Sequence, residues 1–260
     1  MRPMRYSVVI PMYNERAVIA ASLSELAGTM EKAARERGWE YEILLSDDGS
    51  DDGCGEIARK TAEELNLTRG IVKILRAEKN RGKGAAVRSG MLAASGDWRL
   101  FTDSDLAYGA EIVPAMLDAA LEDQNDPASP GCALLIGSRA VGKDGYAGYG
   151  LLRTAASRAY LKLLSLAAGL RCTDSQCGIK LFRRDAAEAI FSRCETDGWA
   201  FDCEVLLLAS RLGFPVREYP ARVLKQGKTK IRLIRDSVGM AGEVARIRRR
   251  LTSREKDAQR

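Results

Sequence analysis

The chain has 260 residues, of which 46% are hydrophobic and 29% charged, and its formal net charge is +6. This size and balance predict one large globular domain, or one domain with an appendage, around a sizeable core. The chain contains no histidine. That excludes a Ser–His–Asp triad, a histidine base and a histidine metal ligand. Acid–base chemistry and metal binding therefore fall to carboxylates, other side chains or water.

Cysteine spacing and apolar runs bear on the compartment. The six cysteines are scattered without CxxC spacing, which favours reduced thiols that pack in a cytosolic protein. Charges interrupt every apolar run well before 18 residues, so no membrane-spanning helix is expected. The first five residues lead directly into a strand-like run rather than a signal-peptide core.

The first half alternates β-branched apolar runs with alanine-rich or amphipathic stretches. Strands are predicted at 6–11, 41–45, 70–75 and 99–102, and helices at 17–37, 54–65 and 85–95. This alternation predicts an α/β protein with a doubly wound, mostly parallel central sheet flanked by helices. Ligands bind such sheets at the carboxyl ends of the strands, so the loops there are the first candidates for a site.

Residues 46–53 follow the second strand and contain four aspartates and two glycines. Carboxylates at a strand end can accept hydrogen bonds from a base or a ribose, as in dinucleotide-binding folds. The alternative is a solvated loop that caps the following helix.

Residues 80–88 form a second polar loop, with Lys83 between Gly82 and Gly84. Its spacing is not that of a Walker motif. The glycines nevertheless allow close approach of the backbone to a ligand, and a helix N-terminus beside a lysine favours anions.

Asp103 and Asp105 follow the fourth strand with one residue between them. Two carboxylates there can hold a hard divalent cation, which would neutralise charge on a departing diphosphate. Alone, the pattern fits a polar turn capping the next helix equally well.

Taken together, these motifs resemble the nucleotide-sugar-binding half of inverting family 2 glycosyltransferases, which have the GT-A fold. Later segments resemble the polyprenyl (dolichyl)-phosphate glucose and mannose synthases. The similarity spans roughly residues 6–235 by motif placement. The matching stretches are Val8–Pro11 with Tyr13–Glu15, Asp47–Gly53, Gly82–Ala85, Asp103-x-Asp105, Thr173–Phe182 and Gly198–Glu204.

The resemblance implies roles for individual residues. The nucleotide pocket would be lined by Pro11, Tyr13, Glu15, Asp48 and Lys83. Asp103 and Asp105 would contact the diphosphate and a Mg²⁺ or Mn²⁺ ion. Asp174 and residues 199–202, including Trp199 and Asp202, would face the sugar and acceptor. Asp105, Asp174 and Asp202 are thus the candidate catalytic carboxylates. The Gln-x-x-Arg-Trp motif of processive relatives is absent from the sequence.

The second half continues the pattern. A strand at 133–139 ends in Arg139, which could meet phosphate. The small-residue loop 141–150 is expected near the acceptor. The amphipathic helix predicted at 151–170 either packs in the core or cradles a lipid tail. A helix at 201–212, a strand at 215–220 and a helix at 234–251 follow, with a frayed tail at 252–260. We expect a GT-A domain over 1–235, with a nucleotide-sugar half (1–106) and an acceptor half (107–235), and a C-terminal basic extension over 236–260.

Positive charge is concentrated after residue 220. Such a run is most often a solvated face; sharper alternatives are contact with a polyanionic substrate, with anionic lipid or with nucleic acid. No nucleic-acid-binding motif is present, so nucleic acid ranks last. The loop 225–232 is interpreted as closing over the diphosphate, and the later helix as contacting a membrane surface. The cations are Lys225, Lys228, Lys230 and Arg232 in the loop, and Arg246, Arg248, Arg249 and Arg250 in the helix.

These observations predict a metal-dependent inverting glycosyltransferase that moves a hexose from a UDP- or GDP-sugar to an acceptor, foremost a polyprenyl phosphate. A phosphate acceptor needs no strong base, whereas a hydroxyl acceptor would need Asp174 or Asp202 to take its proton. Transfer to a soluble acceptor, a nucleotide-sugar mutase or nucleotidyltransferase, and a non-catalytic nucleotide-sugar sensor are the alternatives. The expected location is the cytoplasm, with peripheral contact at the inner face of the membrane.

Overall fold

The computed structural model describes residues 3–67, 70–142, 144–145, 154, 161, 169–170, 172–225 and 233–258. The strands are β1 (Arg5–Met12), β2 (Glu40–Asp47), β3 (Val72–Arg76), β4 (Trp98–Thr102), β5 (Leu134–Ser138), β6 (Ile179–Arg183) and β7 (Val216–Pro220). The helices are α1 (Ile19–Arg37), α2 (Cys54–Glu64), α3 (Lys83–Ala93), α4 (Ile112–Asn125), α6 (Arg184–Phe191), α7 (Phe201–Arg211) and α8 (Leu233–Ala258).

The strands form one sheet in the order β3-β2-β1-β4-β6-β5-β7. Strand β6 is antiparallel to both of its neighbours, and the other pairings are parallel. The chain therefore runs outward from β1 to β3 and then returns to place β4 on the other side of β1. The topological switch point lies between β1 and β4, which is where an open α/β sheet binds its ligand.

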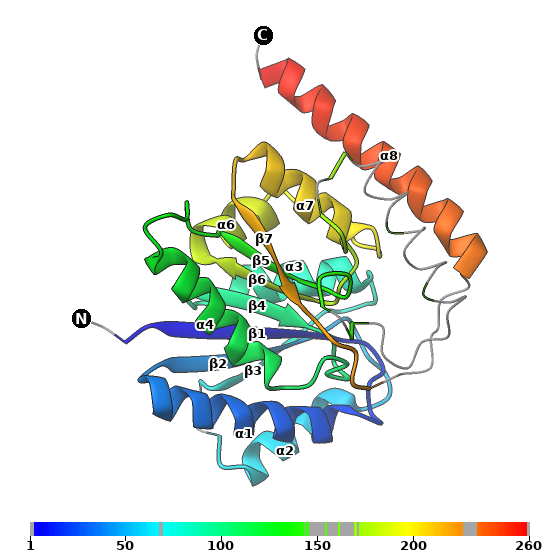
Figure 1. Ribbon diagram of the computed structural model, residues 1–260. Helices are drawn as coiled ribbons and strands as arrows, with labels where there is room; N and C mark the ends of the chain where they lie inside the picture. The colour runs from blue at the N-terminus through cyan, green and yellow to red at the C-terminus, as the bar shows by residue number, and fades with distance from the viewer. Residues whose placement is uncertain are drawn as a thin grey trace.

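Helices cover both faces of the sheet (Figure 1). Alternate residues of β1 point to opposite sides, so Val8 and Ile10 pack with α1 and α4, whereas Val9 packs with α3 and α7. The C-terminal helix α8 lies outermost. It buries Val244, Ile247 and Leu251 in the hydrophobic core on the α3 and α7 side of the sheet. This arrangement confirms the expected α/β class with a mostly parallel central sheet and a C-terminal helical extension.

Sequence patterns did not identify α4, β6 or α6, and they placed the end of the last helix too early. Strand β6 carries a fully buried lysine, Lys180, which interrupts the apolar run that identifies a core strand. The tail after Leu251 was predicted to fray, but α8 continues to Ala258. Arginine, glutamate, lysine and alanine supply good helix formers there. Most of the helix predicted at 151–170 lies outside the described residues.

The cysteine and membrane expectations can also be compared with the structure. All six cysteines are free thiols, and five of them are buried. Within the part of the chain that the structure describes, no helix combines the length and apolar character needed to cross a bilayer.

Candidate active site

The site is built on the loops that follow β1, β2 and β4 and on the N-terminus of α3. Two hydrogen bonds from backbone N–H groups to side chains join the first two loops. Asn14 N–H donates to Ser50 Oγ at 3.0 Å, and Asp51 N–H donates to Asn14 Oδ1 at 3.1 Å. Asn14 adopts a left-handed backbone with φ of 55°. Tyr13 beside it is 42% exposed. An exposed aromatic ring at the end of β1 is therefore available to a flat ligand at the switch point.

Asp48 follows β2 and is buried. Its carboxylate accepts hydrogen bonds from the backbone N–H groups of Arg81 at 3.0 Å and Gly82 at 2.6 Å. The structure thus places Asp48 as an anchor for the loop that precedes α3. A separate cavity of about 340 Å³ adjoins the loop that follows β2, and Asp47, Arg59 and Arg76 are among the residues that line it.

The N-terminus of α3 carries Lys83, whose Nζ forms an ion pair with Asp103 Oδ1. The ammonium also lies 5.3 Å from the centre of the Trp199 ring, which is 55% exposed. Burial lowers the pKa of Lys83, but the charges of Asp103, Asp202 and Asp105 outweigh this and raise it overall. Lys83 is therefore a fixed cation at the positive end of the α3 dipole, an arrangement suited to phosphate. The N–H groups of Gly84 and Ala85 in this first turn donate to the carbonyl of Asp197.

The residues after β4 give the site its negative charge. The Asp103 side chain is 33% exposed. Asp105 Oδ1 accepts a hydrogen bond from Ala107 N–H at 3.0 Å. Burial and the neighbouring charge of Asp103 raise the pKa of Asp105. Among the described residues, no group of three or more acidic, cysteine or histidine side chains is arranged to hold a metal.

Both carboxylates proposed as an acceptor-side base are paired with cations. Asp174 is fully buried, and its oxygens accept from Arg139 Nε at 2.6 Å and Nη2 at 2.9 Å. Burial disfavours the charged guanidinium, but the bonds to Asp174 outweigh this and raise the pKa of Arg139. Arg139, predicted to meet phosphate, is thus held by Asp174 at the end of β5.

Asp202 opens α7 and is buried against Lys180, whose Nζ lies 2.6 Å from its Oδ1. Burial raises the pKa of Asp202, and the charges of Lys180 and Lys83 act in the opposite direction. Lys180 also donates to the carbonyl of Cys177 at 2.7 Å. The sequence interpretation missed Lys180, although it lies in one of the stretches that carry the family resemblance.

The remaining predicted residues are distributed as follows. Pro11 is buried in β1, and the Glu15 carbonyl accepts hydrogen bonds from the N–H groups of Val18 and Ile19 at the start of α1. Lys225 points to α1, where its Nζ lies 2.6 Å from Glu25 Oε2. Lys228 and the rest of the loop 226–232 lie outside the described residues. The structure therefore brings together Asp48, Lys83, Asp103, Asp105, Trp199 and Asp202, and it places the Arg139–Asp174 pair at the neighbouring end of β5.

Comparison with known proteins identifies relatives of this chain. Residues 7–191 match the profile of glycosyl transferase family 2. The chain is 33% identical over 248 residues to dolichyl-phosphate beta-glucosyltransferase of Saccharomyces cerevisiae, covering 93% of this chain and 73% of that protein. It is 36% identical over 220 residues to the Drosophila melanogaster protein of the same name, covering 83% of this chain and 66% of that protein. The chain thus spans about two thirds to three quarters of these relatives.

A solved structure with a similar fold is glucosyl-3-phosphoglycerate synthase from Mycobacterium tuberculosis, in complex with Mn²⁺, UDP and glucosyl-3-phosphoglycerate. Its TM-score is 0.62 at 19% identity, over 94% of this chain and 78% of that one. Mannosyl-3-phosphoglycerate synthase from Rubrobacter xylanophilus gives 0.62 at 17% identity, over 97% and 75% of the two chains. At these identities the likeness concerns the fold, and it agrees with the GT-A architecture expected from the sequence.

Proposed function

Because the chain belongs to glycosyl transferase family 2, we propose that it transfers a hexosyl group from a nucleoside-diphosphate sugar to a polyprenyl phosphate. Two relatives named as dolichyl-phosphate beta-glucosyltransferases support both the lipid phosphate and glucose as the sugar. The observation that carries the proposal is the Lys83–Asp103 pair at the topological switch point, under the exposed ring of Trp199.

In this proposal the donor lies across the ends of β1, β2 and β4. Tyr13 and the loop anchored by Asp48 border the nucleoside. Lys83 at the N-terminus of α3 binds the diphosphate, since a lysine and the positive end of a helix dipole both favour anions. Trp199 offers an apolar face to the sugar. UDP and GDP are both candidate nucleotides.

The carboxylates of Asp103 and Asp105 fit a hard divalent cation such as Mg²⁺ or Mn²⁺, because they are two oxygen ligands close to one another and partly exposed. Burial and repulsion from Asp103 raise the pKa of Asp105, and a positive charge there would relieve the repulsion. Donor phosphate oxygens would supply further ligands. Such an ion would stabilise the negative charge that develops on the departing diphosphate.

The pairing of both candidate bases favours a phosphate acceptor. Arg139 occupies both oxygens of Asp174, and Lys180 holds Asp202. A polyprenyl phosphate is already an anion near neutral pH, so its oxygen attacks C1 without transferring a proton to either residue. The C1–O bond to the diphosphate breaks as the new C1–O bond forms on the opposite face, and the configuration at C1 inverts.

We place the acceptor side near a membrane surface. Arg246, Arg248 and Arg249 are exposed on α8, whereas Val244 and Ile247 face the core. Cations in this arrangement suit the surface of an anionic bilayer. Arg250 does not belong to this exposed group, because it forms ion pairs with Glu195 and Glu204.

The experiment is a transfer assay with the purified chain. UDP-glucose or GDP-mannose is incubated with Mg²⁺ or Mn²⁺ and a short-chain polyprenyl phosphate, and released nucleoside diphosphate and glycosylated lipid are measured together. We expect both products in equal amounts, and loss of both on chelation of the metal. Nucleoside diphosphate released only with hydroxyl acceptors would replace the lipid proposal by the soluble-acceptor alternative. No transfer to any acceptor would overturn the proposed activity.

A further inference from the structure

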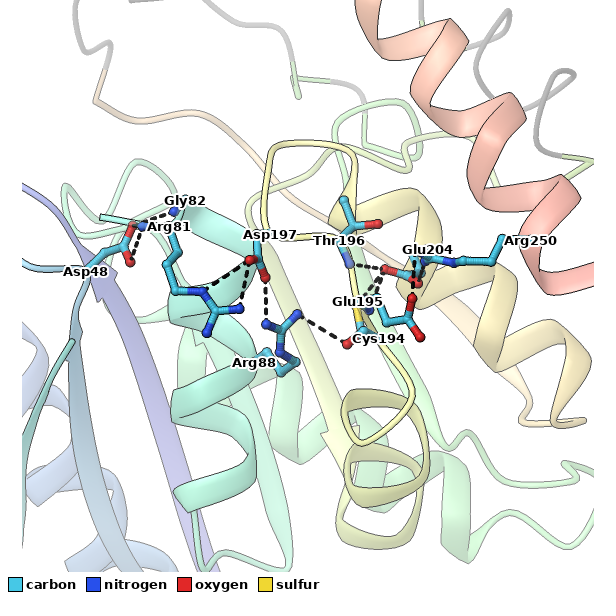
Figure 2. A network of polar contacts seen from close by, with 10 residues as sticks. All are labelled: Asp48, Arg81, Gly82, Arg88, Cys194, Glu195, Thr196, Asp197, Glu204 and Arg250. Carbon is cyan, nitrogen blue, oxygen red and sulfur yellow. Dashed lines mark hydrogen bonds and ion pairs between the residues drawn. The ribbon is translucent and has the colours of Figure 1, made fainter. Parts of the chain in front are cut away.

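A continuous chain of polar contacts links the C-terminal helix to the loop that presents Lys83 (Figure 2). It runs from Arg250 in α8 through Glu204 in α7 to residues 194–197, and from there through Arg81 to Asp48. Apart from the Asp48 contact with the loop before α3, none of these contacts enters the function proposed above. These contacts hold the loop before α3, which leads into Lys83, and residues 194–199, which include Trp199.

At one end, the guanidinium of Arg250 bridges two carboxylates. Its Nη1 lies 3.0 Å from Glu195 Oε2, and its Nη2 is paired with Glu204 Oε1. The Glu204 side chain is fully buried. Burying a carboxylate costs free energy unless a cation and hydrogen bonds compensate, and Arg250 supplies the cation.

The second oxygen of Glu204 holds the backbone of the segment before Trp199. Glu204 Oε2 accepts from Thr196 N–H at 2.7 Å and from Glu195 N–H at 3.0 Å, and it also accepts from the thiol of Cys194 at 3.1 Å. Glu204 is therefore a connector, with the helix α8 on one oxygen and residues 194–196 on the other.

The same segment braces the N-terminus of α3. The carbonyl of Asp197 accepts from Gly84 N–H at 2.8 Å, and its carboxylate accepts from Arg88 Nη2 at 2.6 Å and Arg81 Nη2 at 2.9 Å. The contact is close: a methyl group at the α-carbon of Gly82 would come within 2.5 Å of the Asp197 carbonyl oxygen. Lys83 lies between these two glycines, so movement of residues 194–199 moves the lysine or the aromatic ring above it.

We infer that Arg250 is a positioning residue for the nucleotide-sugar site: through Glu204 and Glu195 it fixes residues 194–199, which set the relative placement of Lys83 and Trp199. The inference rests on the proposed function, because it assigns Lys83 and Trp199 to donor binding. It also connects the helix proposed to contact the membrane with the donor site.

The test uses Arg250→Gln, with Arg249→Gln as the matched control. Arg249 is the preceding residue of α8, is exposed, and donates to the carbonyl of Ala245 in its own helix. We expect Arg250→Gln to raise the dissociation constant for UDP or GDP, measured by calorimetry without acceptor, by at least fivefold and to raise the donor KM in parallel. Arg250→Lys, which keeps a cation for Glu204, should restore most of the affinity. Arg249→Gln should bind as the wild type does.

A purely structural role predicts a different result, namely a lower free energy of unfolding with unchanged nucleotide affinity of the folded protein. That result, or equal affinities for the two glutamine variants, overturns the inference. If Arg250→Gln fails to fold, Glu195→Gln takes its place. It removes the outer partner of Arg250 and leaves Glu204 in place, so a twofold or greater loss of affinity supports the inference and wild-type affinity overturns it.

A second measurement separates this inference from the proposed function. Acrylamide quenching of Trp199, obtained as the difference between each protein and its Trp199→Phe counterpart, reports the placement of residues 194–199 without any ligand. We expect the quenching of Trp199 to change in Arg250→Gln and not in Arg249→Gln. If the wild type binds neither nucleotide, the proposed function fails. An unchanged Trp199 signal would overturn the positional link whatever the binding result.

Discussion

Gly178 lies directly against the carboxylate of Asp103. A methyl group at the α-carbon of Gly178 would come within 2.0 Å of Asp103 Oδ2 and 2.8 Å of its Cγ. The Gly178 N–H also donates to Tyr108 Oη at 3.3 Å, on the loop that follows Asp103. The segment before β6 therefore forms one wall of the carboxylate site and limits where the Asp103 side chain can lie.

We expect Gly178→Ala to displace the Asp103 carboxylate and to lower kcat about a hundredfold, since small displacements of a positioned group have effects of this size. Gly28→Ala is the matched control, because Gly28 lies in α1 with open space around its α-carbon. That substitution should leave turnover unchanged and stabilise the protein by roughly 0.5–1 kcal/mol. Steady-state kinetics and denaturant unfolding of both variants measure these effects. Normal turnover in folded Gly178→Ala would contradict the role of Asp103.

Asp103→Asn and Asp105→Asn should each lower turnover on the order of a thousandfold, because each removes a negative charge from the site proposed to hold the cation. Both variants should fold, since both side chains are partly exposed. Asp126→Asn, at the exposed end of α4, is the control. Transfer assays across a range of Mn²⁺ concentrations provide the measurement. Near-normal activity in either variant, at any Mn²⁺ concentration, would remove that residue from the metal site.

The strands of the first half and the polar loops at their carboxyl ends could be predicted from the sequence because the evidence for them is local. Each strand of the first half is a short apolar run that ends in polar residues, and the alternation with helices implies parallel pairing. The strand β6 could not be found in this way. It pairs antiparallel with β4 and β5, and the ammonium of its buried Lys180 finds its charged partner in Asp202, 22 residues away.

The partners of the site residues were also beyond the reach of the sequence. By resemblance, Asp48 is predicted to line the nucleotide pocket, and the sequence does not show that its oxygens accept two backbone N–H groups more than 30 residues away. Arg250 belongs to a run of arginines that reads as one solvated face. Helical geometry turns Arg250 toward α7 and the segment before it, where Glu204 and Glu195 are its partners. Such pairings depend on the packing of distant elements, and residue spacing does not contain them.

Glu42 lies near the start of β2, at the opposite end of the strand from the site, and should make the free energy of unfolding depend on pH. Its carboxylate is fully buried in β2. Burial alone would raise the pKa of Glu42, but hydrogen bonds from Lys73, Ser7 and Ser95 lower it from 4.5 to about 2. A carboxyl whose folded-state pKa is depressed stabilises the protein above its unfolded pKa, and this contribution is lost as the pH falls toward the folded pKa. The difference corresponds to roughly 3 kcal/mol.

We therefore expect the free energy of unfolding to decrease by about this amount between pH 5 and pH 2 through Glu42 alone. Glu42→Gln should be less stable at pH 7, and its stability should depend less on pH across this window. Glu40→Gln is the control, because Glu40 is exposed at the start of the same strand. Urea unfolding at several pH values measures the three curves. Parallel curves for wild type and Glu42→Gln would show that Glu42 does not carry this dependence.

The last prediction concerns the exposed arginines of α8. Each cation near an anionic surface contributes about 1 kcal/mol, so replacing Arg246, Arg248 and Arg249 by glutamine should weaken binding to phosphatidylserine-containing vesicles roughly a hundredfold at low salt. Arg250 stays unchanged in this variant, because it forms ion pairs with Glu195 and Glu204 and does not belong to the exposed group. Turnover on a short, water-soluble polyprenyl phosphate should survive, since none of the three side chains is assigned to the donor site.

The matched control removes the same charge from the far side of the molecule, by glutamine substitution of Arg35, Arg59 and Lys60 on α1 and α2, which lie away from α8 (Figure 1). If only net charge matters, both triple variants lose vesicle binding equally. If α8 is the contact surface, the control keeps most of its binding, and raising the salt concentration weakens the wild type toward the α8 variant, because screening reduces exposed electrostatic attraction. Co-sedimentation with vesicles across a salt series, beside the transfer assay, measures both quantities. Wild-type protein that ignores anionic vesicles at low salt would contradict the membrane contact, and the lipid acceptor would then have to reach the site by another surface.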